Sequence, residues 1–347
     1  MSKMKKNKGL KIAIVGATGL VGRTFLKVLE ESFLPIEEIR LFATERSAGQ
    51  FLEFKGTKLI VENVKQADFT KFDVALFSAG KVASKEIVPS AVKSGCLVID
   101  NGSYWRMHPN VPLVVPEVNF YQALRHKGLI ANPNCSTIQL VVALKPIKMK
   151  YGLRKVEVST YQAISGAGQK GIQKLQKELA TGKTENILSK HPIAFNVIFH
   201  SIPSKYNFSE EETKIINETK KILEDKKLKI TATCVRIPVL VSHCESVSIA
   251  TKEEFYLDEL EETLKSSPGI KIIDEPEKEE YPTPQLAEGT DFVYIGRIRR
   301  NPAEKNGLHL WVVADNVRKG AASNAVQILE KLWKENPEKI SNFKSLF

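Results

Sequence analysis

Cys135 is the side chain of this sequence best placed for covalent chemistry. It follows Asn132-Pro133-Asn134 and stands just before the helical pattern of Thr137–Met149. Proline ends the preceding strand, and asparagine or serine can cap the helix. A thiol at a helix N-terminus gains thiolate character from the helix dipole and the unpaired N–H groups, and the thiolate is the nucleophile. The residues alone leave two interpretations open, a reactive thiol or a small buried packing residue.

The other three cysteines carry no comparable signal. Cys96, Cys234 and Cys244 form no CxxC pair, and no His/Cys cluster has the spacing of metal ligands. We therefore expect buried packing residues, no disulfide and no metal site.

A glycine-rich turn provides the second chemical signal. Gly16-Ala17-Thr18-Gly19-Leu20-Val21-Gly22 lies between an apolar strand and an amphipathic helix. Glycine lets the backbone turn sharply and approach a pyrophosphate, whose charge then rests on the helix N-terminus. The alternative is tight strand–helix packing without a ligand. The predicted cofactor contacts here are Gly16, Thr18, Gly19, Leu20, Val21 and Gly22.

The residues that follow the second strand determine whether NAD or NADP binds, because the ribose of the cofactor lies there. There Arg46 and Ser47 suit the 2′-phosphate of NADP, because a guanidinium pairs bidentately with phosphate. Glu45 argues for NAD, since a carboxylate prefers a free 2′-hydroxyl. The sequence favours NADP (NADPH) and leaves the conflict with Glu45 open.

Alternating strands and helices surround these motifs in the first third of the chain. Such alternation predicts βαβ units and a Rossmann-like, doubly wound parallel sheet. The predicted strands are Leu10–Val15, Ile39–Ala43, Leu59–Val61, Val74–Ser78 and Leu97–Asp100, and the helices are Leu20–Glu31 and Ala83–Ser94.

After Pro133 the pattern changes to longer strands with helices to one side, which predicts an α+β substrate and dimerisation domain. We expect domains at 1–132 and 133–319, with 320–347 completing the first and the catalytic crevice at their junction. The predicted strands are Val156–Ala163, Lys229–Arg236, His243–Thr251, Phe292–Arg299 and His309–Ala314. The predicted helices are Thr137–Met149, Lys170–Ala180, Glu210–Asp225 and Ala321–Lys334, whereas Lys183–Glu210 reads as irregular and Ser267–Gly289 as a loop.

Length and composition limit the class of protein. A chain of 347 residues exceeds what one hydrophobic core usually supports, and 42% hydrophobic with 26% charged residues is typical of globular proteins. No apolar run is long enough for a membrane span, and the basic stretch Met1–Lys8 leads into a strand without a signal segment. The net charge of +11 is spread along the chain without a nucleic-acid-reading motif. We expect a cytoplasmic enzyme that binds neither nucleic acid nor membrane.

Six ordered segments carry a resemblance to one family. They are Gly16–Gly22, Arg46–Gly49, Asn132–Thr137, Tyr161–Gly168, Thr233–Pro238 and Lys319–Ala322. From about Leu10 to Lys334 the chain resembles the bacterial type of aspartate-β-semialdehyde dehydrogenase. Its one departure is Glu45, where relatives usually carry a small residue.

The resemblance implies a reaction for the cysteine. Members of the family reduce L-4-aspartyl phosphate with NADPH to L-aspartate 4-semialdehyde and phosphate, on the route to lysine and diaminopimelate, methionine, threonine and isoleucine. Cys135 would form the acyl thioester, His243 would be the general acid/base, and Gln162 would orient the acyl group. Members also form homodimers or homotetramers. Without the resemblance, a lone histidine in a strand is more often a packed residue.

The resemblance also implies the substrate and cofactor contacts. Arg236 would bind the α-carboxylate, Glu211 the ammonium group, and Lys214 and Arg106 the phosphate. The remaining cofactor contacts would be Ser165, Gly166 and Asn324. Without the resemblance, Glu211 and Lys214 would read as a surface ion pair, because residues three apart share a helix face.

Several other classes remain as alternatives. N-acetyl-glutamyl-phosphate reductases usually place the cysteine in His-Pro-Gly-Cys, and glyceraldehyde-phosphate-type dehydrogenases follow it with Thr-Thr-Asn, unlike Ser136 and Thr137 here. Malonyl-CoA reductases share the scaffold and stay open. A non-catalytic relative is disfavoured, because Cys135, Gln162, Arg236 and His243 are all retained.

Overall fold

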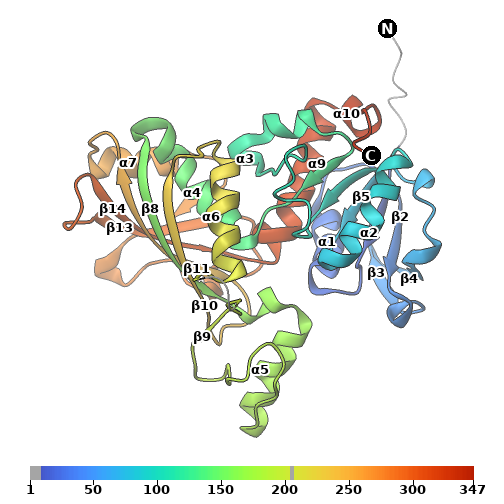
Figure 1. The fold of residues 1–347 in the computed structure, drawn as a ribbon, viewed down its shortest axis with the longest axis horizontal. Coiled ribbons are helices and arrows are strands. Elements are labelled where there is room, and N and C mark those ends of the chain that lie inside the picture. The colour runs from blue at the N-terminus through green and yellow to red at the C-terminus, as the bar shows by residue number, and fades with distance from the viewer. Residues whose placement is uncertain (1–8, 204–206) are drawn as a thin grey trace. The chain divides into compact units, whose positions relative to one another are not determined.

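A computed structural model describes residues 9–203 and 207–347, and the chain divides into two compact units (Figure 1). The first unit comprises the residues up to Pro133 together with Ala322–Phe347, and the second comprises Asn134–Ala321. Each unit is built on a seven-stranded sheet.

The sheet of the first unit has the order β3-β4-β2-β1-β5-β6-β7. Every neighbouring pair is parallel except the hairpin of β3 and β4. The order reverses between β1 and β5, which is the Rossmann topology and places the ligand crevice at that point. This confirms the predicted doubly wound sheet. The strands are β1 (Leu10–Val15), β2 (Ile36–Ala43), β3 (Phe51–Phe54), β4 (Thr57–Asn63), β5 (Val74–Phe77), β6 (Leu97–Asp100) and β7 (Leu129–Ala131).

Helices surround this sheet, and one comes from the far end of the sequence. The helix α9 packs against α1, and its apolar side chains join the core of the first unit. The long helices are α1 (Leu20–Glu31), α2 (Gly80–Lys93) and α9 (Ser323–Glu335), and the short ones are α3 (Pro116–Asn119) and α10 (Glu338–Ser341).

The sheet of the second unit is mixed, with the order β12-β13-β14-β11-β8-β10-β9. The strands are β8 (Leu153–Gln162), β9 (Ile198–Phe199), β10 (Lys229–Arg236), β11 (His243–Thr251), β12 (Ile270–Ile272), β13 (Val293–Arg300) and β14 (Gly307–Ala314). The helices are α4 (Cys135–Tyr151), α5 (Gln169–Thr181), α6 (Glu210–Ile222), α7 (Leu257–Lys265) and α8 (Pro284–Ala287). Helices α4, α6 and α7 pack on the sheet, while α5 projects away from it (Figure 1). This arrangement confirms the predicted α+β class.

Several predictions about elements were incomplete. Ser267–Gly289 is not a plain loop, because it contains β12 and α8. The predictions also lacked the edge strand β3, the short strand β7 and the helix α7. Within residues 9–203 and 207–347, no helix has both the length and the apolar character that a membrane span requires.

Candidate active site

The glycine turn in the first unit is a tight backbone cradle between β1 and α1. Gly16 has a φ of +87°, and a Cβ there would lie 2.5 Å from the carbonyl oxygen of Ser78. A Cβ on Gly22 would lie 2.2 Å from the carbonyl oxygen of Gly16, so both positions exclude any side chain. Gly19 is the N-cap of α1, whose first turn holds no acidic residue. The turn therefore fits a pyrophosphate group at the helix N-terminus.

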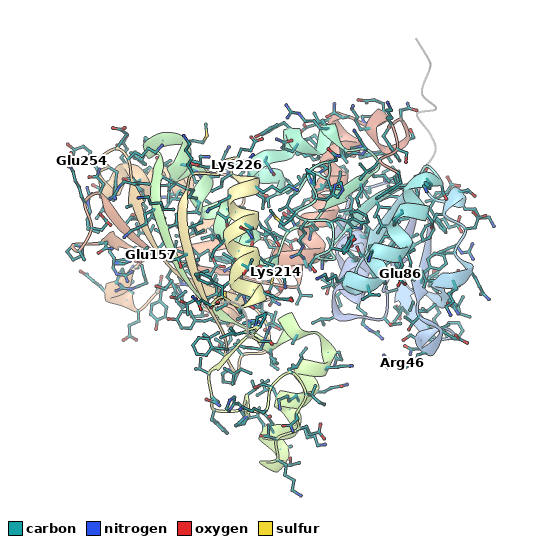
Figure 2. All side chains as sticks on the ribbon, in the orientation of Figure 1. Arg46, Glu86, Glu157, Lys214, Lys226 and Glu254 are labelled. Atoms are coloured by element: carbon teal, nitrogen blue, oxygen red, sulfur yellow. The ribbon has the colours of Figure 1, made fainter. Side chains whose placement is uncertain are left out.

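The residues predicted to choose between NADP and NAD follow β2 in a short 3-10 turn, Glu45–Ser47. Glu45 and Arg46 are both exposed, with Arg46 extending from this turn (Figure 2). Both the guanidinium of Arg46 and the carboxylate of Glu45 can therefore contact a ligand. The geometry does not decide between NADP, which Arg46 favours, and NAD, which Glu45 favours.

The two other predicted residues of this unit are buried. Arg106 is 7% exposed, and its Nη2 donates to the carbonyl oxygen of Asn101 at 2.9 Å. Asn324 is fully buried, and its Nδ2 donates to Oδ1 of Asn132 at 2.7 Å and to the carbonyl oxygen of Val114 at 3.0 Å. Asn324 thus braces the chain just before the cysteine motif, and its contact with the cofactor stays a prediction.

Cys135 is the first residue of α4 in the second unit and is half-buried. Asn134 is the N-cap: its backbone is extended, and its Oδ1 accepts the N–H of Thr137 at 3.2 Å. Gly320 approaches from the end of the unit so closely that a Cβ there would lie 2.9 Å from Cβ of Cys135. The thiol therefore stands at a capped helix N-terminus, where the dipole favours the thiolate.

The other cysteines differ from Cys135 in burial. Cys96, Cys234 and Cys244 are buried, and none of the four cysteines is in a disulfide, which confirms the predicted packing role. Burial raises the pKa of the Cys244 thiol to about 12 and raises the pKa values of the other two above the ordinary value. These thiols therefore stay protonated and unreactive at neutral pH.

A buried carboxylate lies beside the cysteine motif. Glu211 accepts hydrogen bonds from Nδ2 of Asn134 at 2.7 Å and from Nε2 of Gln162 at 3.2 Å. Its other oxygen lies 3.3 Å from Nζ of Lys214, which extends from α6 (Figure 2). Burial acts to raise the pKa of Glu211, but Lys214, His200 and the two amide hydrogen bonds lower it to about 2. Glu211 is therefore a buried anion and not half of a solvated surface pair.

Arg236, at the end of β10, supplies the positive charge opposite this anion. Its Nη1 donates to the carbonyl oxygen of Ala163 at 2.7 Å. Burial lowers the pKa of Arg236, while the charges of Glu211 and Cys135 raise it. The guanidinium stays charged at neutral pH and acts on the same site as the cysteine.

His243, at the start of β11, is fully buried. The N–H of Ala163 donates to its Nδ1 at 3.0 Å, so the neutral ring carries its proton on Nε2. No partner for Nε2 occurs among the described residues, and a Cβ on Gly166 would lie 3.2 Å from it. Burial and the nearby Arg236 lower the pKa of His243 to about 3. The ring is packed, as a structural histidine would be, but it presents an unused N–H donor.

No sequence pattern points to two further polar residues of this unit. The Oδ1 of Asn316 accepts the Oγ hydrogen of Ser165 at 3.1 Å and the N–H of Ser242 at 2.9 Å. Ser242 has a φ of +74° and immediately precedes His243, so Asn316 holds a strained residue. His200 is near enough to Glu211 to lower its pKa, but it lies in the irregular segment, where periodicity gives no signal.

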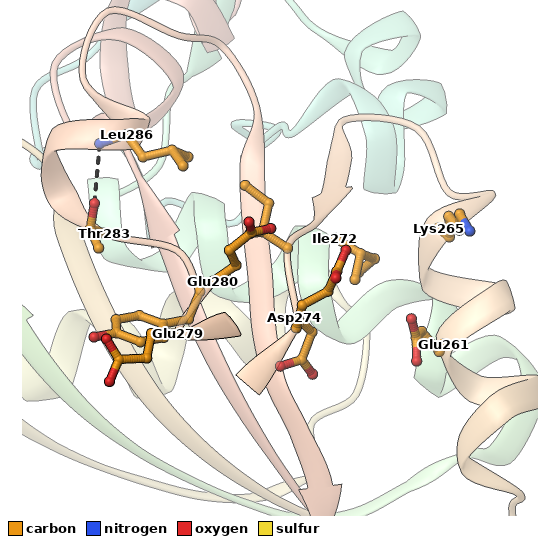
Figure 3. Close-up of a pocket in the computed structure, with 11 residues that line it drawn as sticks. Glu261, Lys265, Ile272, Asp274, Glu279, Glu280, Thr283 and Leu286 are labelled. Carbon is orange, nitrogen blue, oxygen red and sulfur yellow. Dashed lines mark hydrogen bonds between the residues drawn. The ribbon is translucent and has the colours of Figure 1, made fainter. Parts of the chain in front are cut away.

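A pocket of about 630 Å³ elsewhere in the second unit has five carboxylates among its eleven lining residues (Figure 3). It contains none of the predicted site residues. The oxygens of Asp274 already accept the N–H groups of Arg297 and Ile298. No group of three or more His, Cys, Asp or Glu side chains in 9–203 and 207–347 is placed to hold a metal ion.

Comparisons with known proteins cover both units. The family description "Semialdehyde dehydrogenase, NAD binding domain" matches residues 11–126, and "Semialdehyde dehydrogenase, dimerisation domain" matches residues 144–319. An aspartate-semialdehyde dehydrogenase of Aquifex aeolicus is 53% identical, covering 94% of this chain and 99% of that protein. One of Bacillus subtilis is 44% identical, covering 95% and 99%.

Solved structures agree with these matches. Aspartate semialdehyde dehydrogenase II of Vibrio cholerae, complexed with ASA, superposes with a TM-score of 0.91 at 40% identity, covering 95% of this chain and all of that one. The enzyme of Candida albicans with NADP superposes with a TM-score of 0.75 at 26% identity, covering 95% and 99%.

The Rossmann unit and the cysteine-bearing α+β unit together define a two-domain NAD(P)-binding oxidoreductase that acts on a semialdehyde. High identity over nearly the whole length makes the assignment narrower. The chain belongs to the aspartate-semialdehyde dehydrogenase family, whose members are enzymes of amino-acid biosynthesis.

Proposed function

We propose that this chain converts L-4-aspartyl phosphate and NADPH into L-aspartate 4-semialdehyde and phosphate through a thioester on Cys135. The reaction stands on the route to lysine and diaminopimelate, methionine, threonine and isoleucine. One observation carries the proposal: a half-buried thiol at the N-terminus of α4, in one unit with the buried anion Glu211 and the guanidinium of Arg236.

The two buried charges suit a free amino acid. An α-amino acid presents one carboxylate and one ammonium group, so its pocket needs a cation and an anion. Arg236 binds the carboxylate in a bidentate pair, and Glu211 binds the ammonium group. Because the pKa of Glu211 is about 2, this carboxylate is ionised at neutral pH, where the substrate amine is charged. An acetylated amine carries no positive charge for this buried anion to bind, which disfavours the N-acetylated substrates of related reductases.

The phosphate contacts are Lys214 and Arg106. The ammonium of Lys214 lies 3.3 Å from Glu211 and is 31% exposed, which leaves part of it available to an anion. Arg106 lies in the first unit with its guanidinium largely buried, so it is held in one orientation. The cations offset the negative charge of the leaving phosphate.

Cys135 and His243 carry the covalent chemistry. The Cys135 thiolate attacks the acyl carbon, the C–O bond to phosphate breaks, and the phosphate leaves with the electron pair. The N–H on Nε2 of His243 donates to the oxygen that becomes negative in this step. Gln162 orients the acyl group, since its Nε2 is already held by Ser136 at 3.1 Å and by Glu211.

The cofactor contacts lie in both units. When bound, NADPH supplies a hydride to the thioester carbon. The glycine turn and the N-terminus of α1 bind the pyrophosphate, and Arg46 with Ser47 binds the 2′-phosphate. Ser165, Gly166 and Asn324 complete the contacts. The Candida albicans relative with NADP supports NADP over NAD.

We further propose a cytoplasmic homodimer or homotetramer. The segment from α5 to the start of α6 exposes an unusual number of large apolar side chains: Leu179, Ile187, Leu188, Phe195, Val197, Phe199, Ile202 and Phe208. Exposed apolar side chains concentrated in one segment favour an association surface, and the matching family description is a dimerisation domain. A reactive thiol outside disulfides suits the reducing cytoplasm.

The test follows NADPH absorbance in the reverse direction, with L-aspartate 4-semialdehyde, phosphate and NADP. We expect phosphate-dependent formation of NADPH, loss of turnover in Cys135→Ala, and retained binding of NADP by that variant. Absence of phosphate-dependent reduction would refute the proposed reaction. Normal turnover by Cys135→Ala would refute the thioester. N-acetylglutamate semialdehyde serves as the control substrate and should not react.

A further inference from the structure

The backbone N–H of the residue before the nucleophile is held by a buried carboxylate that the proposed reaction does not use. The backbone N–H of Asn134 donates to Oε2 of Glu218 at 2.7 Å. Glu218 lies on α6 and is only 1% exposed. At 2.7 Å this is a short hydrogen bond to a carboxyl oxygen in a buried place, where an unpaired N–H group is costly.

Asn134 is fixed at four points, and two of them come from α6. Its Oδ1 caps the helix, its carbonyl oxygen accepts the N–H of Ile138 at 2.9 Å, and its Nδ2 reaches Glu211. Glu218 holds the fourth point, the backbone N–H. Glu211 and Glu218 are seven residues apart, which places them two turns apart on one face of α6.

We propose that Glu218 is a positioning residue for the proposed nucleophile: it holds the Asn134 peptide so that α4 begins at Cys135 with its thiol at the helix N-terminus. The inference rests on the proposed function, because it assumes that Cys135 is the reacting group. Without an acceptor, the buried N–H of Asn134 is unpaired, and the peptide group that joins Pro133 to Asn134 rotates to find another partner. That rotation changes the backbone dihedral angles of Asn134 and so displaces Cys135, the next residue along the chain.

A matched control lies on the same helix. Glu212 is also buried, and its oxygens accept the backbone N–H groups of Cys234 at 3.0 Å and Ser209 at 2.7 Å. Glu212 therefore ties α6 to β10 and to its own N-cap without holding Asn134. Removing the Glu212 carboxylate therefore measures how much stability and activity are lost when α6 is held less firmly but the contact with Asn134 remains.

The experiment compares Glu218→Leu, Glu218→Gln and Glu212→Leu by kcat, KM, thermal midpoint and the pH profile of Cys135 alkylation by iodoacetamide. For Glu218→Leu we expect kcat to fall about 10- to 100-fold, as for misplaced catalytic groups. KM for the semialdehyde should stay within about twofold, and the alkylation profile should shift. Glu218→Gln keeps an oxygen acceptor and should restore kcat to within about threefold of the wild type. Glu212→Leu should lose thermal stability but keep kcat and the alkylation profile.

Two results would overturn the inference. One is wild-type kcat and alkylation in Glu218→Leu, and the other is an equal loss of kcat in Glu212→Leu at an equal loss of thermal midpoint. If Glu218→Leu does not fold, Glu218→Asp replaces it: the shorter side chain withdraws the acceptor but keeps the charge, and kcat should fall about tenfold. A wild-type kcat in Glu218→Asp would then overturn the inference. Failure of the proposed function is seen separately, as an active Cys135→Ala.

Discussion

Replacing Gly320 with alanine should misplace the thiol without touching a reacting group. The new Cβ would lie 2.9 Å from Cβ of Cys135, 3.3 Å from its Cα and 3.4 Å from the carbonyl oxygen of Asp315. Carbon atoms prefer about 3.5–4.0 Å, so Cys135 or the 320 backbone must move by at least about 0.6 Å. Because the new Cβ meets only backbone and Cβ atoms, no flexible side chain can absorb the shift.

A displacement approaching 1 Å at a reacting group costs about 100-fold in rate, which corresponds to about 2.7 kcal/mol of transition-state stabilisation. We therefore expect kcat of Gly320→Ala to fall between 10- and about 100-fold, and overpacking to lower the free energy of unfolding by about 1–3 kcal/mol. The assay measures phosphate-dependent NADPH formation, alkylation of Cys135 and the thermal midpoint.

The control for this variant is Gly182→Ala. Gly182 ends α5 with a φ of +67° and has no atom within 4 Å of its Cβ position, so alanine there introduces backbone strain alone. It should lower stability by about 1–2 kcal/mol and leave kcat unchanged. A folded Gly320→Ala with wild-type kcat would show that the position of Cys135 does not limit the reaction.

Three further predictions concern protons, cofactor and assembly. His243 has a pKa of about 3 in the folded protein and 6.5 ordinarily, so the unfolded chain takes the proton first and stability falls as pH drops from about 6.5 to 3. His243→Gln should reduce that pH dependence, as measured by urea unfolding at each pH. Arg46→Ala should raise KM for NADP by about 10-fold or more while leaving KM for NAD nearly unchanged, whereas Glu45→Ala should increase the preference for NADP. Phe195, at 92% exposure, should hold the association surface, so Phe195→Glu should lower the oligomeric mass seen by light scattering.

Much of the fold could be predicted because several elements are self-contained. The bounds of β1, α1, β6, β10 and β11 agree with the predicted ranges. Each is a continuous apolar or amphipathic segment, and the spacing of its apolar residues is typical of either a strand or a helix but not of both.

The missed elements depend on partners or unusual turns. The hairpin of β3 and β4 turns at Lys55 and Gly56, both with positive φ, and Lys-Gly is not the common Asn-Gly signal. The strand β12 has three residues and is stabilised by pairing with β13, which local sequence cannot show. The helix α7 is different, because its buried Leu260 and Leu264 recur at helical spacing and could have predicted it.

The candidate site also contains residues that the sequence could predict and residues that it could not. Side-chain chemistry and the family resemblance predicted Cys135, Glu211, Arg236 and His243, which the second unit contains as one polar cluster. Glu218 and Asn316 could not be predicted, because they act on backbone N–H groups, which every residue except proline has.

The backbone of Ala163 has a consequence for redesign, because the two adjacent peptide groups that meet at this residue hold different side chains. Its N–H holds the imidazole of His243, and its carbonyl oxygen holds the guanidinium of Arg236. Replacing Arg236, the proposed carboxylate ligand, to admit a substrate without a carboxylate also frees the carbonyl group of Ala163. The same residue then holds His243, the proposed proton donor, less firmly, so substrate range and turnover cannot be tuned independently through position 236.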